Sequence, residues 1–416
     1  MVTPVPLHEP WTKARVHVAE APDGGILVAS EAEVARYAAD GQLDPSFGRG
    51  GFLTVALPSV ASFEISDVAV DAEGRIVLTG TALVASGEGP ASSMATVVRY
   101  LPDGELDPGF GGGDGTFISR FGLPAADGAV VARQGAVSQS GAVTLVVGTV
   151  SRSATCGAPQ QRERDRLIAR LSAAGTIERF FGDGGVQRIA PLETVTDMAF
   201  GQGGGISLAG PALGECGGPA QTAVISLRPD GERRRGFATA GVRRLSGAVA
   251  AIAVDPRGRT VMLFKERQKP AIDEHVTKLV RLLPNGDRDP SFDKNGLIVY
   301  EFQGPLYKWS SLLVTPSGRL LAVGTLIRPL PAKKRKDGVR FHRWFMVWPL
   351  RESGEQAGGF GFLGWLAITR FNRRSDAAAS DALIGADGNL LIAGTARDPT
   401  LAPQGGFALA RYDLWH

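Results

Sequence analysis

The sequence predicts an all-β fold, a seven-bladed β-propeller with four antiparallel strands in each blade. Two repeated signals carry this prediction: a glycine followed six residues later by phenylalanine, and a turn glycine followed by an apolar run. Both recur about every 61 residues, which is typical of chains built from repeated supersecondary units. A chain of 416 residues would ordinarily hold two or three domains, but a closed ring grows by adding blades.

The first signal marks a turn between two strands. Its fullest copies read ADGQLDPSFGRGG at 39–51 and PDGELDPGFGGG at 102–113. The six copies are Gly41–Phe47, Gly104–Phe110, Gly175–Phe181, Gly231–Phe237, Gly286–Phe292 and Gly354–Phe360. Carboxylates among the glycines of 111–115 and 181–185 raise a calcium loop as an alternative, but their spacing does not fit an EF-hand. We expect turn chemistry, with aspartate capping its own backbone and phenylalanine filling the gap between blades.

The second signal marks the second strand of each unit. It occurs seven times, at 24–30, 74–80, 141–148, 204–210, 258–264, 318–324 and 388–394. An alternating stretch such as ISDVAVD (65–71) precedes the turn glycine and predicts the first strand. ATVVRYL (95–101) and GTFISRF (115–121) show the pattern of the third and fourth strands. Glycine at the turn tolerates φ above zero without steric cost.

The sequence contains seven apolar runs but six glycine–phenylalanine turns, so one blade lacks the turn that leads to its fourth strand. This difference predicts how the ring closes. The last unit ends in a third strand at 407–416, and residues 1–7 align with the fourth strand at 52–58. We therefore expect residues 1–7 to be the outer strand of blade 7, which removes two free sheet edges. The predicted blades span 13–57, 64–121, 128–190, 194–245, 248–303, 309–370 and 378–416.

The repeat resembles the delta-60 repeat family of bacterial proteins. Residues 21–51 and 71–113 carry the resemblance best, while 232–241 and 355–364 lack its Leu-Asp-Pro core. The resemblance implies a propeller-like fold and often an exported or surface protein. It implies no particular activity.

Composition sets the broad class. Hydrophobic residues make up 44% and charged residues 21% of the chain, with a net charge of +3. That charge does not call for a nucleic-acid partner, and no apolar run is long enough to predict a transmembrane segment. The first eleven residues lack the basic-then-apolar plan of a signal peptide, so we expect any export signal to be absent or already removed.

The two cysteines predict a disulfide. Cys156 and Cys216 follow the closing glycines of two successive apolar runs by eight and six residues, which places them in equivalent loops of neighbouring blades. A Cys156–Cys216 bond implies an oxidising, extracytoplasmic compartment: periplasmic, secreted or cell-surface. The alternative is two unpaired thiols, and zinc is disfavoured because no histidine lies near either cysteine.

A polar ring is predicted at the central channel. The positions seven residues before each turn glycine are His17, Asp67, Gln134, Asp197, Ala251, Ser311 and Asp381. First strands are innermost in propellers, so six polar side chains should face the axis. One interpretation is a cation or substrate site, with calcium as the cation considered. The other is that these groups satisfy the backbone of the neighbouring blade and line a wet channel. Asp67, Asp197 and Asp381, in blades 2, 4 and 7, are not expected to be immediate neighbours.

The segment 331–344 is the most charged stretch and falls in a loop on the same face as the cysteines. Its candidate binding residues are Lys333, Lys334, Arg335, Lys336, Arg340, Arg343 and Trp344. They suit an acidic glycan, a lipid headgroup or an acidic protein; the alternative is a solvated loop.

Two functions remain open from the sequence. The first is a non-enzymatic, exported module that binds a protein or glycan through its loop-rich face, without a cofactor. The alternative is a propeller hydrolase or lyase with a metal-assisted site at the channel. No nucleophile, zinc-protease or dinucleotide motif is present in the sequence.

Overall fold

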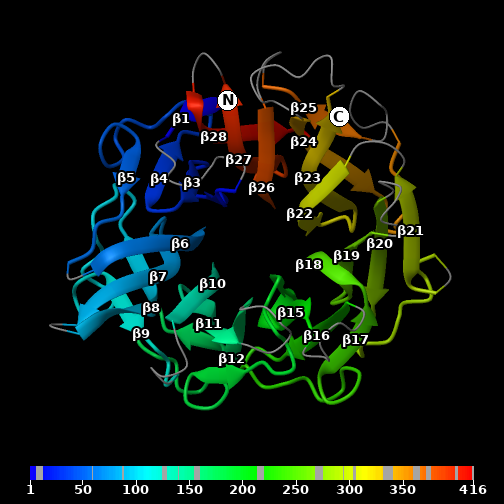
Figure 1. The fold of residues 1–416 in the computed structure, drawn as a ribbon, viewed down its shortest axis with the longest axis horizontal. Coiled ribbons are helices and arrows are strands. Elements are labelled where there is room, and N and C mark those ends of the chain that lie inside the picture. The colour runs from blue at the N-terminus through cyan, green and yellow to red at the C-terminus, as the bar shows by residue number, and fades with distance from the viewer. Residues whose placement is uncertain are drawn as a thin grey trace.

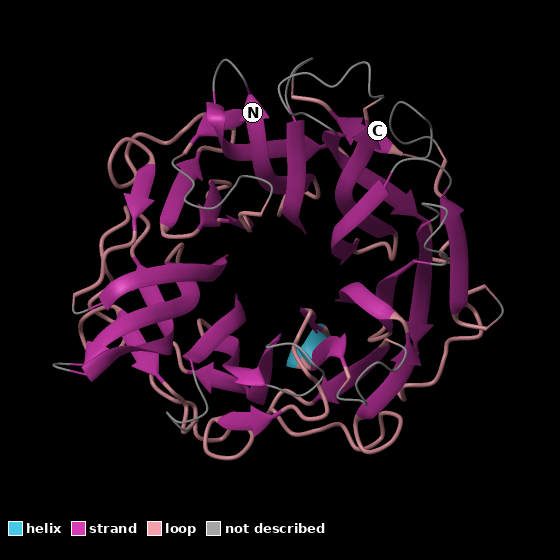
Figure 2. Ribbon diagram, in the orientation of Figure 1, coloured by secondary structure: helices cyan, strands magenta, loops and turns pink. Residues whose placement is uncertain are grey.

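The computed structural model describes residues 1–5, 13–58, 60–86, 89–123, 129–138, 140–153, 160–212, 220–267, 275–293, 295–302, 306–330, 341–358, 366–371, 376–398 and 402–414. Within these ranges seven four-stranded antiparallel sheets surround a common axis, as Figure 1 shows. The predicted seven-bladed β-propeller is confirmed. The 3-10 turn η2 (Gln202–Gly204) is the single helical element of these ranges and is the cyan segment in Figure 2. No helix in the described ranges meets the length and hydropathy needed to cross a membrane.

The blades follow one another in chain order, and the strands of each blade run from the axis outwards. Blade 1 is β2 (His17–Glu20), β3 (Ile26–Ser30), β4 (Glu33–Tyr37) and β5 (Phe52–Thr54). Blade 2 is β6 (Val60–Val70), β7 (Ile76–Ser86), β8 (Gly89–Tyr100) and β9 (Thr116–Ser119). Blade 3 is β10 (Ala129–Val137), β11 (Val143–Ser153), β12 (Gln160–Leu171) and β13 (Val186–Arg188). Blade 4 is β14 (Asp197–Phe200), β15 (Ile206–Pro211), β16 (Gln221–Leu227) and β17 (Val242–Ser246).

The remaining blades have the same order. Blade 5 is β18 (Ala248–Val254), β19 (Thr260–Arg267), β20 (His275–Leu282) and β21 (Leu297–Phe302). Blade 6 is β22 (Leu306–Val314), β23 (Leu320–Pro329), β24 (Phe341–Leu350) and β25 (Ala367–Thr369). Blade 7 is β26 (Asp376–Ile384), β27 (Leu390–Asp398) and β28 (Ala402–Tyr412), with β1 (Val2–Pro4) as its outer strand.

The ring closes through its two ends, as predicted. Strand β1 pairs antiparallel with β28, with Val2 opposite Ala408 and Pro4 opposite Gly406. The Met1 ammonium also donates a hydrogen bond to the Leu409 carbonyl at 2.8 Å. Figure 1 shows β1 beside β28 at the junction of the blue and red ends of the chain. The first and last strands of the chain therefore belong to one sheet.

Each apolar cluster is shared by two neighbouring blades. One joins Leu27 and Phe47 of blade 1 to Ile76 of blade 2, and another joins Phe110 of blade 2 to Leu145 of blade 3. A blade is thus covered on both faces. Its middle strands are apolar almost throughout because neither face meets solvent, and this produces the uninterrupted apolar runs in the sequence.

The glycine–phenylalanine turn holds neighbouring blades together. A Cβ at Gly231, whose φ is +83°, would lie 2.8 Å from the Phe181 ring of the preceding blade. Only glycine satisfies both the turn conformation and this close approach. The turn aspartates cap the backbone as expected: Asp107 accepts a hydrogen bond from the Gly109 amide at 2.8 Å. The predicted turn chemistry accounts for these residues.

The structure adds an arginine contact that the sequence pattern did not reveal. Arg99, on the third strand of blade 2, is 2% exposed and pairs with the turn carboxylate of Asp107 at 2.6 Å. Its guanidinium lies over the Phe110 ring and donates to the Ala173 carbonyl of blade 3. The same donation across a blade boundary occurs for Arg36 to Pro102, Arg170 to Pro229, Arg281 to Glu352 and Arg411 to Ala39. We call this contact the arginine bridge.

Candidate functional site

The predicted polar ring lies on the innermost strands, and β-bulges position it in most blades. The pairing of the first two strands shifts register between Ile65 and Asp67, and the same shift precedes Gln134, Ala251, Ser311 and Asp381. A bulge bends its strand and redirects the side chain that follows. In these five blades the ring position therefore follows a β-bulge, and in all seven blades it lies seven residues before the turn glycine.

An axial cavity of about 910 Å³ opens at this ring. The polar side chains that line it are His17, Asp67, Gln134, Asp197, Ser311 and Asp381. Ala251, at the seventh ring position, is fully buried and does not line the cavity. All six polar ring positions are thus among the residues that line this cavity.

The three ring aspartates bridge neighbouring blades in one recurring way. In each case one oxygen accepts from the amide of the next residue in its own strand, and the other accepts from an amide of the following blade. Asp67 binds Val68 and Gly135, Asp197 binds Met198 and Ile252, and Asp381 binds Ala382 and Val18, at 2.8–3.1 Å. These bonds satisfy main-chain amides of two neighbouring blades. The interpretation that the ring residues satisfy the backbone of the neighbouring blade therefore explains part of the hydrogen bonding of each carboxylate.

The ring also brings together three titratable groups. His17, Asp67 and Asp381 each offer a ligand atom, and these atoms lie within 4.8 Å of one another. His17 Nδ1 is 3.6 Å from Asp67 Oδ1. We expected the aspartates of blades 2 and 7 to be apart, but their side chains meet across blade 1, because the axis is where the first strands converge. Asp197 is held separately, accepting from Gln134 Nε2 at 3.0 Å.

Burial sets the protonation of this group. It raises the pKa of Asp67 well above its usual value, and the negative charge of Asp381 adds to that effect. Burial also raises the pKa of Asp197 and of Asp381 to about 6. It lowers the pKa of His17 to about 4, assisted by the positive charge of Arg15. His17 is therefore a neutral imidazole at pH 7, the form that binds a metal ion.

Four basic residues around the cavity were not identified from the sequence. Lys13, Arg15, Arg133 and Lys308 line it together with the polar ring. Each lies one to four residues before a ring position on the same inner segment, which is the signal that would have found them. The cavity thus combines an acidic group with cationic side chains along its wall.

Most of the other sequence-predicted site residues lie outside the described residues. These are Cys156, Cys216, Lys333, Lys334, Arg335, Lys336 and Arg340. Arg343 and Trp344 are described, on β24. Arg343 forms an ion pair with Asp376 at 3.1 Å, and Trp344 is 8% exposed and packs in the apolar cluster shared by blades 5 and 6. The Trp344 ring is not presented at the surface, since strand alternation turns it inwards.

The fold and the site define a seven-bladed β-propeller with a polar axial cavity. The family model described as "Domain of unknown function (DUF5122) beta-propeller" matches residues 21–47, 72–110 and 276–292. This supports a propeller repeat family, while the delta-60 resemblance stays a prediction. No curated protein matches the sequence significantly.

Solved propellers are similar in fold. A gluconolactonase from Xanthomonas campestris is 14% identical, with 75% of this chain and 84% of that chain covered and a TM-score of 0.37. The calcium-binding protein regucalcin from Agrobacterium tumefaciens is 13% identical, with coverages of 76% and 83% and a TM-score of 0.38. A virginiamycin B lyase from Staphylococcus aureus is 8% identical, with coverages of 94% and 95% and a TM-score of 0.45. At these identities the likeness concerns the fold alone.

Proposed function

We propose that this propeller binds a small anionic ligand in its axial cavity, on a divalent cation held by His17, Asp67 and Asp381. The observation that carries the proposal is the convergence of these three groups, from three different blades, within 4.8 Å. The cavity volume of about 910 Å³ suits a small molecule.

The backbone bridges alone do not account for this group. Asp197 also bridges two blades, yet its remaining neighbour is the amide of Gln134. Asp67 and Asp381 instead face each other and a histidine, although two nearby carboxylates repel when both are ionised. The buried His17 Nε2 has no hydrogen-bond partner among the described residues, and an unpartnered buried nitrogen is costly. A cation among the three groups removes the repulsion between the carboxylates.

The donor set favours one class of cation over calcium, the cation considered from the sequence. Imidazole nitrogen with two carboxylates suits zinc or manganese. Calcium takes six to eight oxygen ligands, and the oxygens beside this histidine are those of two aspartates. Zinc or manganese should therefore bind more tightly than calcium.

The basic wall supports an anionic ligand. Lys13, Arg15 and Lys308 are exposed side chains that line the cavity, and they attract negative charge toward the axis. A cation there can polarise a bound carbonyl or phosphoryl oxygen, so metal-assisted hydrolysis or elimination is the reaction class that this site supports. The loop-rich face, on which the exported interaction module depends, falls largely outside the described residues.

Isothermal titration of EDTA-treated protein with zinc, manganese and calcium tests the proposal. Zinc or manganese should bind with one ion per chain, and Asp67→Asn or His17→Ala should weaken that binding at least about tenfold. Asp197→Asn is the matched control, because Asp197 lies in the same ring outside the group; its charge acts on Asp67 and Asp381, so the substitution should weaken binding less than either ligand variant. The proposal fails if no ion saturates a site, or if all three variants behave alike.

A further inference from the structure

The arginine bridge is missing between blades 4 and 5. Blade 4 carries Ser226 at the position of the bridging arginine and Arg234 at the position of the turn carboxylate. Pro284 of blade 5 stands at the position whose carbonyl accepts the arginine at five other blade boundaries; the boundary between blades 6 and 7 also lacks the arginine, with Pro349 at its position. In blade 4 the arginine thus stands in the turn and not on the strand, and it occupies the position of the carboxylate.

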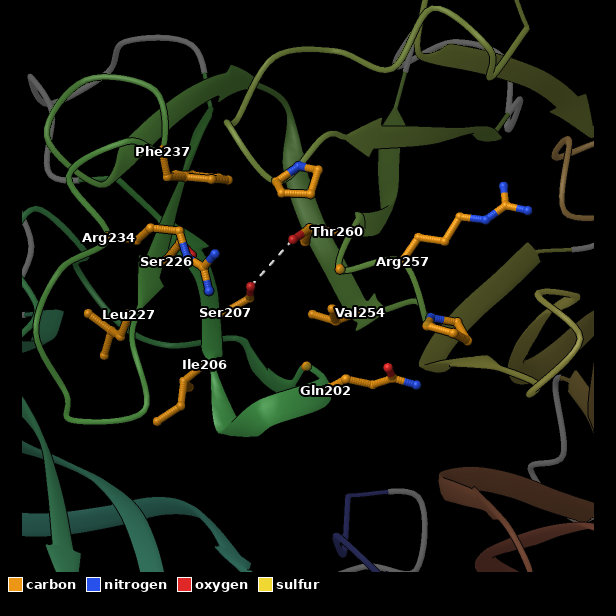
Figure 3. Close-up of a pocket in the computed structure, with 15 residues that line it drawn as sticks. Gln202, Ile206, Ser207, Ser226, Leu227, Arg234, Phe237, Val254, Arg257 and Thr260 are labelled. Atoms are coloured by element: carbon orange, nitrogen blue, oxygen red, sulfur yellow. Dashed lines mark hydrogen bonds between the residues drawn. The ribbon is translucent and has the colours of Figure 1, made fainter.

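A pocket of about 280 Å³ opens at this boundary. Figure 3 shows Phe237 on one side, Ser207 and Thr260 joined by a hydrogen bond, and Arg234 extending toward them. The lining includes Gly201 and Gly205, which contribute no side chain. In blades 2, 3 and 5 an arginine lies over the equivalent phenylalanine, so the pocket follows from the missing guanidinium.

The lining of this pocket is complementary to a negative charge. Among the described residues that line it there is no carboxylate, whereas Arg234 and Arg257 are both present. Arg257 pairs with Glu352 at 2.6 Å, but within the described part of the chain Arg234 forms no ion pair. The hydroxyls of Ser207 and Ser226 add polar groups to the same lining.

The rest of the lining is apolar. Phe237, Val254 and Pro284 contribute to it, and Phe237 is 2% exposed. A ligand that fits therefore has a negative end and a flat or compact apolar body. A phosphate alone would leave the apolar wall uncovered.

We propose that the pocket between blades 4 and 5 is a second binding site, for a small organic carboxylate whose charged end pairs with Arg234 and whose apolar body packs on Phe237. The pocket shares Val254 with the lining of the axial cavity but contains none of the proposed cation ligands, so the site does not depend on the proposed cation. Guanidinium–carboxylate pairs are charge-assisted and geometrically specific, which gives the pocket selectivity for the charge.

The test is titration of metal-free protein with benzoate, with benzamide as the neutral probe of the same shape. Benzoate should saturate one site, and benzamide should bind at least about tenfold more weakly. Arg234→Gln should weaken benzoate binding by at least about tenfold, while Arg235→Ala, an exposed neighbour outside the pocket, should not. Chemical-shift or crystallographic mapping should place benzoate beside Phe237.

A restoring variant makes the test sharper. Ser226→Arg with Arg234→Asp rebuilds the arginine bridge, fills the pocket and should abolish benzoate binding without lowering the melting temperature. Absence of saturable benzoate binding to the wild-type protein overturns the proposal. So does unchanged affinity in Arg234→Gln, or binding that persists in the restored protein. Metal titration of the same samples reports on the axial site independently.

Discussion

Replacing the buried Arg99 with methionine should lower the free energy of unfolding of the propeller more than the same replacement of a surface arginine. The guanidinium is buried, pairs with Asp107 at 2.6 Å and donates to the Ala173 carbonyl of the next blade. Methionine keeps much of the side-chain volume, so the effect reports on charge and hydrogen bonding. Removing one partner of a buried pair leaves an uncompensated charge and costs about 3–5 kcal/mol.

We therefore expect the free energy of unfolding to fall by about 4 kcal/mol in Arg99→Met, with the lost carbonyl hydrogen bond included in that range. Urea unfolding followed by tryptophan fluorescence measures this change. Arg228→Met is the control: Arg228 pairs with Asp230 at 2.8 Å, but both side chains are about half exposed. Such a surface pair contributes roughly 0–1 kcal/mol.

The double variant Arg99→Met, Asp107→Leu distinguishes a buried ion pair from simple loss of packing. Because it removes the stranded carboxylate as well, it should be more stable than Arg99→Met alone. Additive losses in the double variant, or a loss below about 1 kcal/mol in Arg99→Met, would refute the role given to the arginine bridge.

Three further predictions concern closure, pH and redox state. Deleting residues 1–5 removes β1 and exposes the edge of β28, so the melting temperature should drop sharply; an unchanged melting curve contradicts the closure. Asp197 has its folded pKa raised to about 6, so the folded protein holds this proton between about pH 4 and 6, where the unfolded chain has lost it. Its contribution is full below about pH 4 and lost as pH rises through about 6, by up to about 3 kcal/mol. Asp197→Asn should flatten that decline, and an identical pH profile argues against it. Non-reducing peptide mass spectrometry should find Cys156 linked to Cys216, and two alkylated thiols would remove the argument for an oxidising compartment.

The blade repeat could be predicted because each repeated residue is required physically. Gly231 must adopt a φ of +83° and must also approach Phe181 closely, so a glycine and a phenylalanine recur at fixed spacing. The axial ring was found for a similar reason, since strand register fixes its distance from the turn glycine. The spacing of those positions follows from local geometry.

The contacts between distant segments could not be predicted in this way. That Asp67 and Asp381 meet beside His17 depends on the convergence of three blades and on the bulges before two of these residues. Arg99 looks like an exposed residue in the sequence, because a charged side chain on a strand ordinarily faces water. Its burial depends on a turn carboxylate eight residues away and on a carbonyl of the next blade.

Anomalous diffraction can locate the cation that we propose in the axial cavity. Crystals of the protein soaked in manganese should give one anomalous peak on the axis, within bonding distance of His17, Asp67 and Asp381, and the peak should vanish in Asp67→Asn. A map without a peak at this position, in crystals of the intact protein, would show that the three residues do not form a cation site.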